Sequence, residues 1–345
     1  MDYSKRIYYL LLVVIIVLLL LYAESLLIPF VLAILIWFVI RVFKSLLLRI
    51  PYIRKWPHWL LTTISSVILL TFLGLIVSLI SSNIQQLSAS IPDYEKNINT
   101  VAEKINETFD IDLVDSMTNT IRDFDFSNIL SLLFSALTSI FGNALLILVY
   151  LVFILLEETI FRDKLKAIYS SKESLERTTS ILKKIDSSIS NYIAIKSITS
   201  LSTGFLSFWV LYFVGVDAPF FWAFIIFILN YIPNIGSLVA TLFPTVFALL
   251  QFGELTHPLL VLIIVGSIQL AIGSFIEPRI MGNTLNMSPL VVFLTLALWG
   301  TIWGVTGMLL SVPITVIIIL ILNEFPATRG VAALLSRRGD PGSSG

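Results

Sequence analysis

The chain has 345 residues, of which 57% are apolar and 13% are charged, whereas soluble domains average about 45–50% apolar and about 25% charged residues. Its mean hydropathy of +0.96 is typical of a membrane protein with several spans. Basic and acidic residues number 22 each, so no net basicity points to nucleic acid. Cysteine is absent and only two histidines are present, which excludes disulfides, thiolate sites and the usual histidine metal sites.

Motifs of the common enzyme classes are also missing from the sequence. It holds no GxSxG turn for a nucleophilic serine, no HExxH zinc motif and no P-loop. We therefore expect neither an enzymatic activity nor a bound cofactor.

Eight apolar segments follow one another along the chain, and about 20 apolar residues suffice to cross the hydrocarbon core of a bilayer. The segments are 7–23, 26–43, 59–81, 129–156, 198–216, 219–250, 258–275 and 289–322. Pro29 lies in the first turn of the second segment, so the first two segments are expected to form a tight hairpin. The pattern predicts an all-α, polytopic membrane protein.

The distribution of charge predicts the orientation, because cytoplasmic loops are enriched in lysine and arginine. Residues 41–58 carry five basic residues and no acidic one, which places them and the N-terminus in the cytoplasm. Residues 82–127 hold nine acidic and three basic residues, as expected of a segment outside the membrane. Residues 157–197 then lie inside, and three arginines of the C-terminal tail place that end inside as well.

The acidic outer segment contains a heptad pattern typical of a helical seam. Its apolar positions recur at spacings of three and four residues: Ile84, Leu87, Ile91, Tyr94, Ile98, Val101 and Ile105. The seam either closes a helical hairpin within one chain or joins subunits of a homo-oligomer. On the inner side, a helix with Ile181, Ile185 and Ile189 on one face is expected to lie at the interface and lead into the next span.

The last third of the chain contains an internal repeat of two apolar blocks. Each block has an opening proline, a central glycine and a later proline: Pro219, Gly236 and Pro244 in the first, and Pro289, Gly307 and Pro313 in the second. The spacing predicts two broken-helix hairpins, and counting the crossings gives them opposite orientations. This is the inverted-repeat plan of secondary transporters, in which broken helices meet at a site near the midplane.

The predicted organisation has six parts. They are membrane helices over 1–81, an extracytoplasmic acidic helical segment over 82–127, a membrane helix over 128–156, a cytoplasmic amphipathic segment over 157–197, an inverted-repeat transport unit over 198–323, and a cytoplasmic tail over 324–345 whose last five residues resemble a cloning linker.

Polar groups and backbone breaks at membrane depth are the candidates for a solute or ion pathway, because they are costly there unless they serve a function. The candidate residues are Asn230, Pro233, Asn234, Gly236, Gln269, Glu277, Arg279, Asn283, Gly304 and Gly307. Glu277 and Arg279 form either a structural ion pair at a helix end or a solute or proton-coupling site. The two asparagines beside Pro233 either cap broken helix ends or contact solute, and the glycines are expected to permit close packing.

Two stretches carry a resemblance to a known family. Residues 227–236 read Phe-Ile-Leu-Asn-Tyr-Ile-Pro-Asn-Ile-Gly, and residues 277–313 contain Glu-Pro-Arg-Ile-Met-Gly, Ser-Pro-Leu-Val-Val and Gly-Met-Leu-Leu-Ser-Val-Pro. They resemble the autoinducer-2 exporter family, also called the PerM-like permeases. The resemblance implies a bacterial inner-membrane transporter for a small furanone-type signal, with sodium(lithium)/proton antiport in some members. It also implies homo-oligomers, with pentamers expected, and an elevator-like movement of the repeat unit.

Three functions follow from these observations. The first is a secondary exporter of a small polar organic molecule, and the second is a cation/proton antiporter that uses Glu277 as its titrating carboxylate. The third is a non-transporting membrane scaffold that organises partners through the acidic seam. The expected partners are the lipid bilayer and a substrate that is a small molecule or a cation. No nucleic-acid partner is expected.

Overall fold

The computed structural model describes residues 3–48, parts of 52–97, 142–169, 171–282 and 287–337. Throughout these ranges the regular structure is helical, apart from one isolated bridge between Met287 and Ser336. The chain divides into two compact units. The first comprises residues 1–65, 139–194 and 283–345, and the second comprises residues 66–138 and 195–282.

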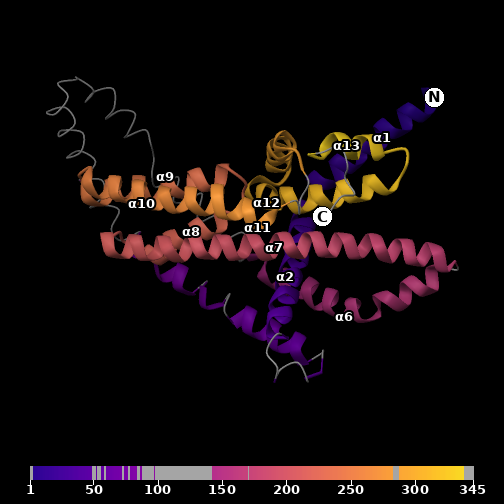
Figure 1. Ribbon diagram of the computed structural model, residues 1–345, viewed down its shortest axis with the longest axis horizontal. Coiled ribbons are helices and arrows are strands. Elements are labelled where there is room, and N and C mark those ends of the chain that lie inside the picture. Colours follow the sequence, from indigo (N-terminus) through magenta and orange to yellow (C-terminus); the bar gives the residue numbers. More distant parts are fainter. Residues whose placement is uncertain are drawn as a thin grey trace. The chain divides into compact units, whose positions relative to one another are not determined.

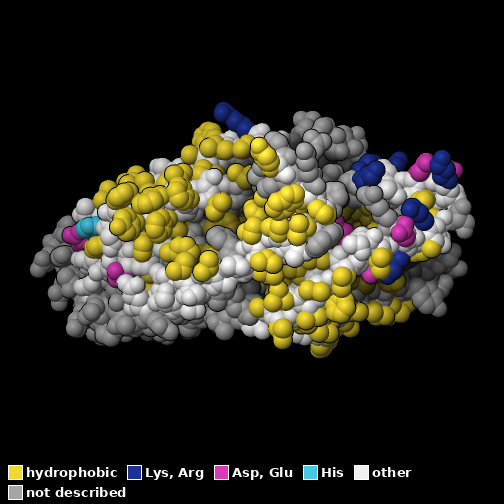
Figure 2. Space-filling model, turned by 90° about the horizontal axis from the view of Figure 1, so that it is seen from below, with side chains coloured by type: hydrophobic (Ala, Val, Ile, Leu, Met, Phe, Trp, Pro, Cys, Tyr) yellow, Lys and Arg dark blue, Asp and Glu magenta, His cyan; other side chains and the backbone are white. Residues whose placement is uncertain are grey.

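Seven helices within the described ranges are long and apolar enough to cross a membrane. Large apolar side chains on them are open to the surroundings, including Phe153, Ile263 and Leu294 at 60% exposure or more, and Figure 2 shows such side chains covering much of one face. Soluble monomers rarely expose apolar patches of this extent, whereas a lipid-facing surface requires them. The all-α polytopic membrane fold expected from the sequence is thereby confirmed.

The predicted apolar segments fall on helices wherever the structure describes them. The first two form α1 (Tyr3–Tyr22) and α2 (Glu24–Leu47), and the third forms a helix over Leu60–Asn83. In the fourth, α6 runs from Ala144 to Ile168, and residues 129–141 lie outside the described residues. Most of the predicted acidic seam also lies outside them, and its one described member, Leu87, is buried.

The longest helix is α7 (Lys172–Val214), which Figure 1 shows as one continuous rod. Its 43 residues correspond to about 65 Å, roughly twice the thickness of a bilayer core. The boundary predicted between 197 and 198 therefore falls inside a helix, because the amphipathic segment and the span after it continue without a break. The first half of α7 belongs to the first unit and the second half to the second unit.

In the first unit, α2 packs against α6, with the rings of Phe30 and Tyr150 edge to face at 5.5 Å. At the end of α2, Arg41 forms a two-pronged ion pair with Asp186 of α7 and lies 3.7 Å from Glu158 of α6. The indole of Trp37 donates to Glu158 at 2.7 Å. The basic end of α2, from which the sequence predicts a cytoplasmic loop, thus forms ion pairs with two other helices.

The second predicted hairpin is α12 (Pro289–Glu324), which breaks at Trp303 and Gly304. Gly304 has φ +58° and ψ −141°, a conformation essentially restricted to glycine. Trp299 and Leu310 lie in one buried cluster with Trp303, although eleven residues of straight helix would separate the first two by about 16 Å. The chain therefore turns back on itself at the break. The indole of Trp303 donates to the carbonyl of Leu20 at 3.0 Å, in the last turn of α1, where carbonyls lack helical partners.

The first predicted hairpin consists of α8 (Pro219–Leu229) and α9 (Ile235–Phe252) in the second unit. The rings of Trp222 and Phe247, 25 positions apart, lie 4.9 Å from each other at a tilt of 39°, so the two arms run antiparallel. Helix α10 (Thr256–Leu270) packs along α9 and continues as a π-helix, η2 (Ala271–Ile276), into the short α11 (Glu277–Met281).

The two breaks are built alike. A Cβ added to Gly236 would lie 1.8 Å from the carbonyl oxygen of Leu229, and one added to Gly307 would lie 1.9 Å from that of Trp299. Each central glycine thus lets the second arm begin against the end of the first, as the packing interpretation of the repeat predicts. At Gly304 the requirement is conformational instead, since an added Cβ there would meet nothing within 4 Å. The two hairpins belong to different compact units, α8 and α9 to the second and α12 to the first.

Candidate functional site

A cavity of about 380 Å³ lies in the second unit, among α7, the tip of the α8–α9 hairpin, α10, η2 and α11. Its polar lining consists of one lysine, one carboxylate, three amides and four hydroxyls: Lys196, Glu277, Asn230, Asn234, Gln269, Thr203, Ser237, Thr241 and Ser274. Its volume is within the range of small-molecule sites. Polar groups at this density are costly in a membrane protein unless they meet a solute, an ion or one another.

The two charges of the cavity form an ion pair. Lys196 Nζ lies 2.5 Å from Glu277 Oε1, and the side chains of the two residues are only 7% and 18% exposed. Thr199 Oγ1 donates to the other carboxylate oxygen at 3.3 Å. The cavity wall therefore carries charges of both signs and no net charge, and its remaining polar groups are neutral.

The partner of Glu277 differs from the one expected from the sequence. Arg279 is exposed on α11 and makes no ion pair among the residues that the structure describes. The reason is geometric, because residues two positions apart on a helix point to different sides and do not face each other. Lys196 lies in the segment 157–197 that is expected in the cytoplasm, although a run of hydroxyl residues directly after it marks a polar face entering the membrane.

Gln269 carries the feature of this cavity that most favours a ligand. The side chain is 6% exposed, and its Nε2 is buried without a hydrogen-bond partner in the described part of the chain. An unpaired buried donor costs about 1–3 kcal/mol. A solute oxygen that accepts from this amide would remove that cost, so Gln269 is the first contact to test.

The hydroxyls that line α7 and α9 are satisfied locally. Thr203 donates to the carbonyl of Thr199, and Thr241 donates to that of Ser237, each at 2.9 Å. A hydroxyl that donates within its own helix keeps its lone pairs as acceptors. These positions can therefore accept hydrogen bonds from a solute hydroxyl, while Gln269 supplies a donor.

The tip of the hairpin places Asn234 on the cavity wall in a strained conformation. Its φ of +59° and ψ of −56°, together with a hydrogen bond from the amide of Ile235 to the carbonyl of Pro233 at 2.6 Å, define a γ-turn of the rare positive-φ form. Such a conformation costs on the order of 1–3 kcal/mol in a residue other than glycine. The tip is held from α7, where Ser197 shares a hydrogen bond of 2.7 Å with the hydroxyl of Tyr231.

Five of the ten residues expected on a pathway line this cavity: Asn230, Pro233, Asn234, Gln269 and Glu277. Gly236 lies in the same hairpin tip, where it sets the approach of the two arms. Gly304 and Gly307 belong to the first unit, and no residue of α12 lines the cavity. Asn283 lies outside the described residues.

Sequence reasoning missed the contribution of η2. This π-helix supplies Gly273 and Ser274 to the wall and carries Glu277 at its end. Single π-turns within helices are rare and occur frequently at functional sites. Its residues, Ala-Ile-Gly-Ser-Phe-Ile, give no sign of the extra residue per turn.

Comparison with known proteins identifies the group to which this chain is related. The family model described as the AI-2E family transporter matches residues 10–327. The AI-2 transport protein TqsA of Escherichia coli K12 is 32% identical over 321 residues, which cover 91% of this chain and 90% of that protein. A putative transport protein of Haemophilus influenzae is 31% identical over the same shares, and the putative transport protein YhhT of E. coli K12 is 30% identical over 73% of this chain and 72% of its own length. The match of nearly the whole chain, together with a helical membrane fold and a polar cavity inside it, shows that this chain belongs to the AI-2E family of transporters.

Proposed function

We propose that the chain is a secondary transporter that exports a small, polar, uncharged organic solute, such as autoinducer-2, through the cavity of the second unit. The observation that carries this proposal is the unpaired amide of Gln269 on a wall whose two charges cancel. A neutral molecule with hydroxyl and carbonyl oxygens matches such a wall, because it meets both the donor and the acceptors and brings no charge to bury. The relationship to a protein named for AI-2 transport supports the choice of solute.

Replacing Gln269 with leucine should separate transport from stability. Loss of one neutral hydrogen bond, about 0.5–1.5 kcal/mol, predicts a rise of up to roughly tenfold in the half-saturating solute concentration. The same change removes an unsatisfied buried donor, so the thermal unfolding temperature in detergent should stay or rise. Efflux of autoinducer-2 from proteoliposomes and a melting curve give the two readouts.

The control is Ser267→Leu, which makes a similar polar-to-leucine change at an exposed position of the same helix. This variant should transport normally. Unchanged transport by Gln269→Leu would exclude Gln269 as a solute contact, and absence of autoinducer-2 flux in the wild-type protein would exclude that solute.

Sodium(lithium)/proton antiport is the second candidate, and the carboxylate of Glu277 on the cavity wall favours it. Antiport requires a carboxylate that exchanges protons on the pathway. It predicts that a sodium gradient drives proton flux in proteoliposomes without any organic solute, and that Glu277→Gln abolishes this flux. If the proton flux instead requires the organic solute, Glu277 would couple protons to solute export and not to sodium.

We further propose a location in the bacterial cytoplasmic membrane, with both termini in the cytoplasm, and assembly into a homo-oligomer. The polar first half of α7 and the basic end of α2 support a cytoplasmic side there. The acidic composition of residues 82–127 supports the opposite side for that segment.

The orientation can be tested with single cysteines, since the chain has none of its own. A cysteine at Ser171, between α6 and α7, should react with a membrane-impermeant thiol reagent only in inverted vesicles. A cysteine at Leu255, before α10, should react only in intact spheroplasts. Reaction of both positions from one side would contradict the proposed crossing of α7.

A further inference from the structure

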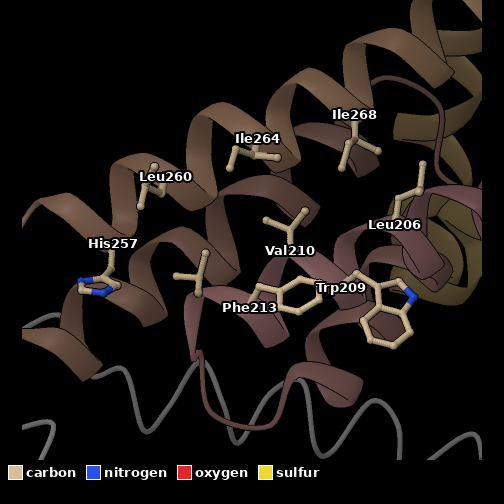
Figure 3. Close-up of a pocket in the computed structure, with 9 residues that line it drawn as sticks. Leu206, Trp209, Val210, Phe213, His257, Leu260, Ile264 and Ile268 are labelled. Atoms are coloured by element: carbon tan, nitrogen blue, oxygen red, sulfur yellow. The ribbon is translucent and has the colours of Figure 1, made fainter.

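Helix α10 and the π-helix after it present two faces of different chemistry. On one face, Ile264 and Ile268 point toward apolar side chains of α7, as Figure 3 shows. The other face lines the polar cavity and runs from α10 through η2 into α11. Its members recur every three or four residues and become polar toward the end: Leu262, Gly266, Gln269, Gly273 and Glu277. Gly273 therefore lies on the cavity wall between the unpaired amide of Gln269 and the carboxylate of Glu277.

The carbonyl of Gly273 has no backbone donor in its own helix. Such a carbonyl accepts from the amide four residues later in a regular helix and five residues later in a π-helix. The amide of Glu277, four residues after Gly273, donates to Ile272 instead. The fifth residue is Pro278, which has no amide hydrogen. No side chain among the residues that the structure describes donates to this oxygen either, and a Cβ added to Gly273 would meet nothing within 4 Å.

Pro278 stands where a helix ordinarily excludes proline. Glu277, the residue before it, has φ −56° and ψ −50°, the helical conformation that a following proline disfavours. The helix nevertheless continues, since the amide of Gly282 donates to the carbonyl of Pro278 at 3.0 Å. An internal proline destabilises a helix, because it removes a hydrogen bond and its ring crowds the preceding turn. Backbone groups freed in this way are tolerated at membrane depth where they line a cavity, as Gly273 does.

We infer that the carbonyl oxygen of Gly273 binds a hydroxyl of the transported solute and that Pro278 keeps this oxygen free. The assignment rests on the proposed export of a small polar solute and adds the group that accepts from it. Gln269 supplies a donor one turn earlier on the same face, so the two groups match a solute with a hydroxyl beside an oxygen acceptor. A bare cation fits less well, because the ammonium of Lys196 is held one turn later, 2.5 Å from Glu277 Oε1.

Pro278→Ala tests the inference because alanine restores the missing amide hydrogen. In the register of η2 this hydrogen reaches the carbonyl of Gly273, so the solute must compete with the helix for that oxygen. The half-saturating concentration for efflux of autoinducer-2 from proteoliposomes should rise roughly two- to tenfold, as expected for one neutral hydrogen bond. The maximal rate should change little. The melting temperature in detergent should stay or rise, because an internal proline is removed.

The matched variant replaces Pro278 with lactic acid, the ester analogue of alanine, by nonsense suppression. It has the shape of alanine but no amide hydrogen, so it should return the half-saturating concentration to the wild-type value. Pro244→Ala is the control for removal of a proline. The carbonyl four residues before Pro244 belongs to Ala240, which is buried and does not line the cavity. This control should leave the half-saturating concentration unchanged, whatever its effect on the melting temperature.

Each of three results would overturn the inference alone. The first is a wild-type half-saturating concentration in Pro278→Ala while Gln269→Leu raises it, which would leave the proposed function standing. The second is an equal rise in the alanine and ester variants, which would assign the effect to the proline ring. The third is a rise in the half-saturating sodium concentration for proton flux with the value for the solute unchanged, which would assign the carbonyl to a cation. Absence of efflux in the wild-type protein would overturn the proposed function and this inference together.

Discussion

Gly236→Ala is expected to destabilise the α8–α9 hairpin more than any other single-methyl change in the second unit. The new Cβ would lie 1.8 Å from the carbonyl oxygen of Leu229 and 2.8 Å from its carbonyl carbon. These are backbone atoms at the end of α8, so no side-chain rotation relieves the clash and the arms must separate. Overpacking of this kind costs about 3 kcal/mol, and thermal unfolding in detergent measures it.

Gly266→Ala provides the matched control on α10. Its Cβ would meet only Thr241 Cγ2 at 3.8 Å, which is ordinary contact, and alanine raises helix propensity by about 1 kcal/mol. This variant should be as stable as the wild-type protein or more so. In the first unit, Gly307→Ala should repeat the loss and Gly330→Ala should not, because an added Cβ at Gly330 meets nothing within 4 Å. If Gly236→Ala unfolded at the wild-type melting temperature, this result would contradict the close contact between the two arms at the tip of the α8–α9 hairpin.

Lys196→Met is expected to produce the second large loss of stability. It leaves the carboxylate of Glu277 without its counter-charge in a site that is 18% exposed. Removal of one partner from a buried ion pair costs about 3–5 kcal/mol, whereas neutralising both partners is often close to neutral. The double variant Lys196→Met with Glu277→Gln should therefore recover most of the lost stability, as measured by thermal unfolding.

Arg279→Gln is the control for the pairing, since exposed substitutions of this type change stability by about 0.5 kcal/mol or less. A large loss of stability in Arg279→Gln, with no loss in Lys196→Met, would instead support the ion pair between Glu277 and Arg279 that was expected from the sequence. Transport by the double variant with an unchanged pH profile would make the ion pair structural and remove Glu277 from ion coupling.

The sequence predicted those features that depend on local chemistry. Hydropathy located the helices because a span of about 20 apolar residues is a property of the segment alone. The Pro–Gly–Pro spacing located both breaks because glycine and proline act on their own backbone and on adjacent turns. Asn230, Pro233 and Asn234 line the cavity together for the same reason, since they belong to one break in the backbone.

The remaining features depend on contacts between distant segments. Lys196 and Glu277 are 81 positions apart, and only the placement of α7 within side-chain reach of α11 brings them together. The strained turn at Asn234 is held from α7 through Tyr231, and the π-turn of η2 has no compositional signature. A stripe of hydroxyls after Lys196 was the available clue, because Thr199, Thr203 and Ser207 lie on the same face of the helix as Lys196.

The π-helix η2 gives α10 a surplus residue immediately before Glu277. Each residue of a helix corresponds to a rotation of about 100° and an advance of about 1.5 Å. If the surplus moved past Glu277 to the following turn, this residue would rotate by about that angle, which would carry its carboxylate away from Lys196. The extra residue can move along the helix from one turn to the next while the backbone hydrogen bonds on both sides stay intact. The direction in which the side chain of Glu277 points is therefore set by the position of this single π-turn.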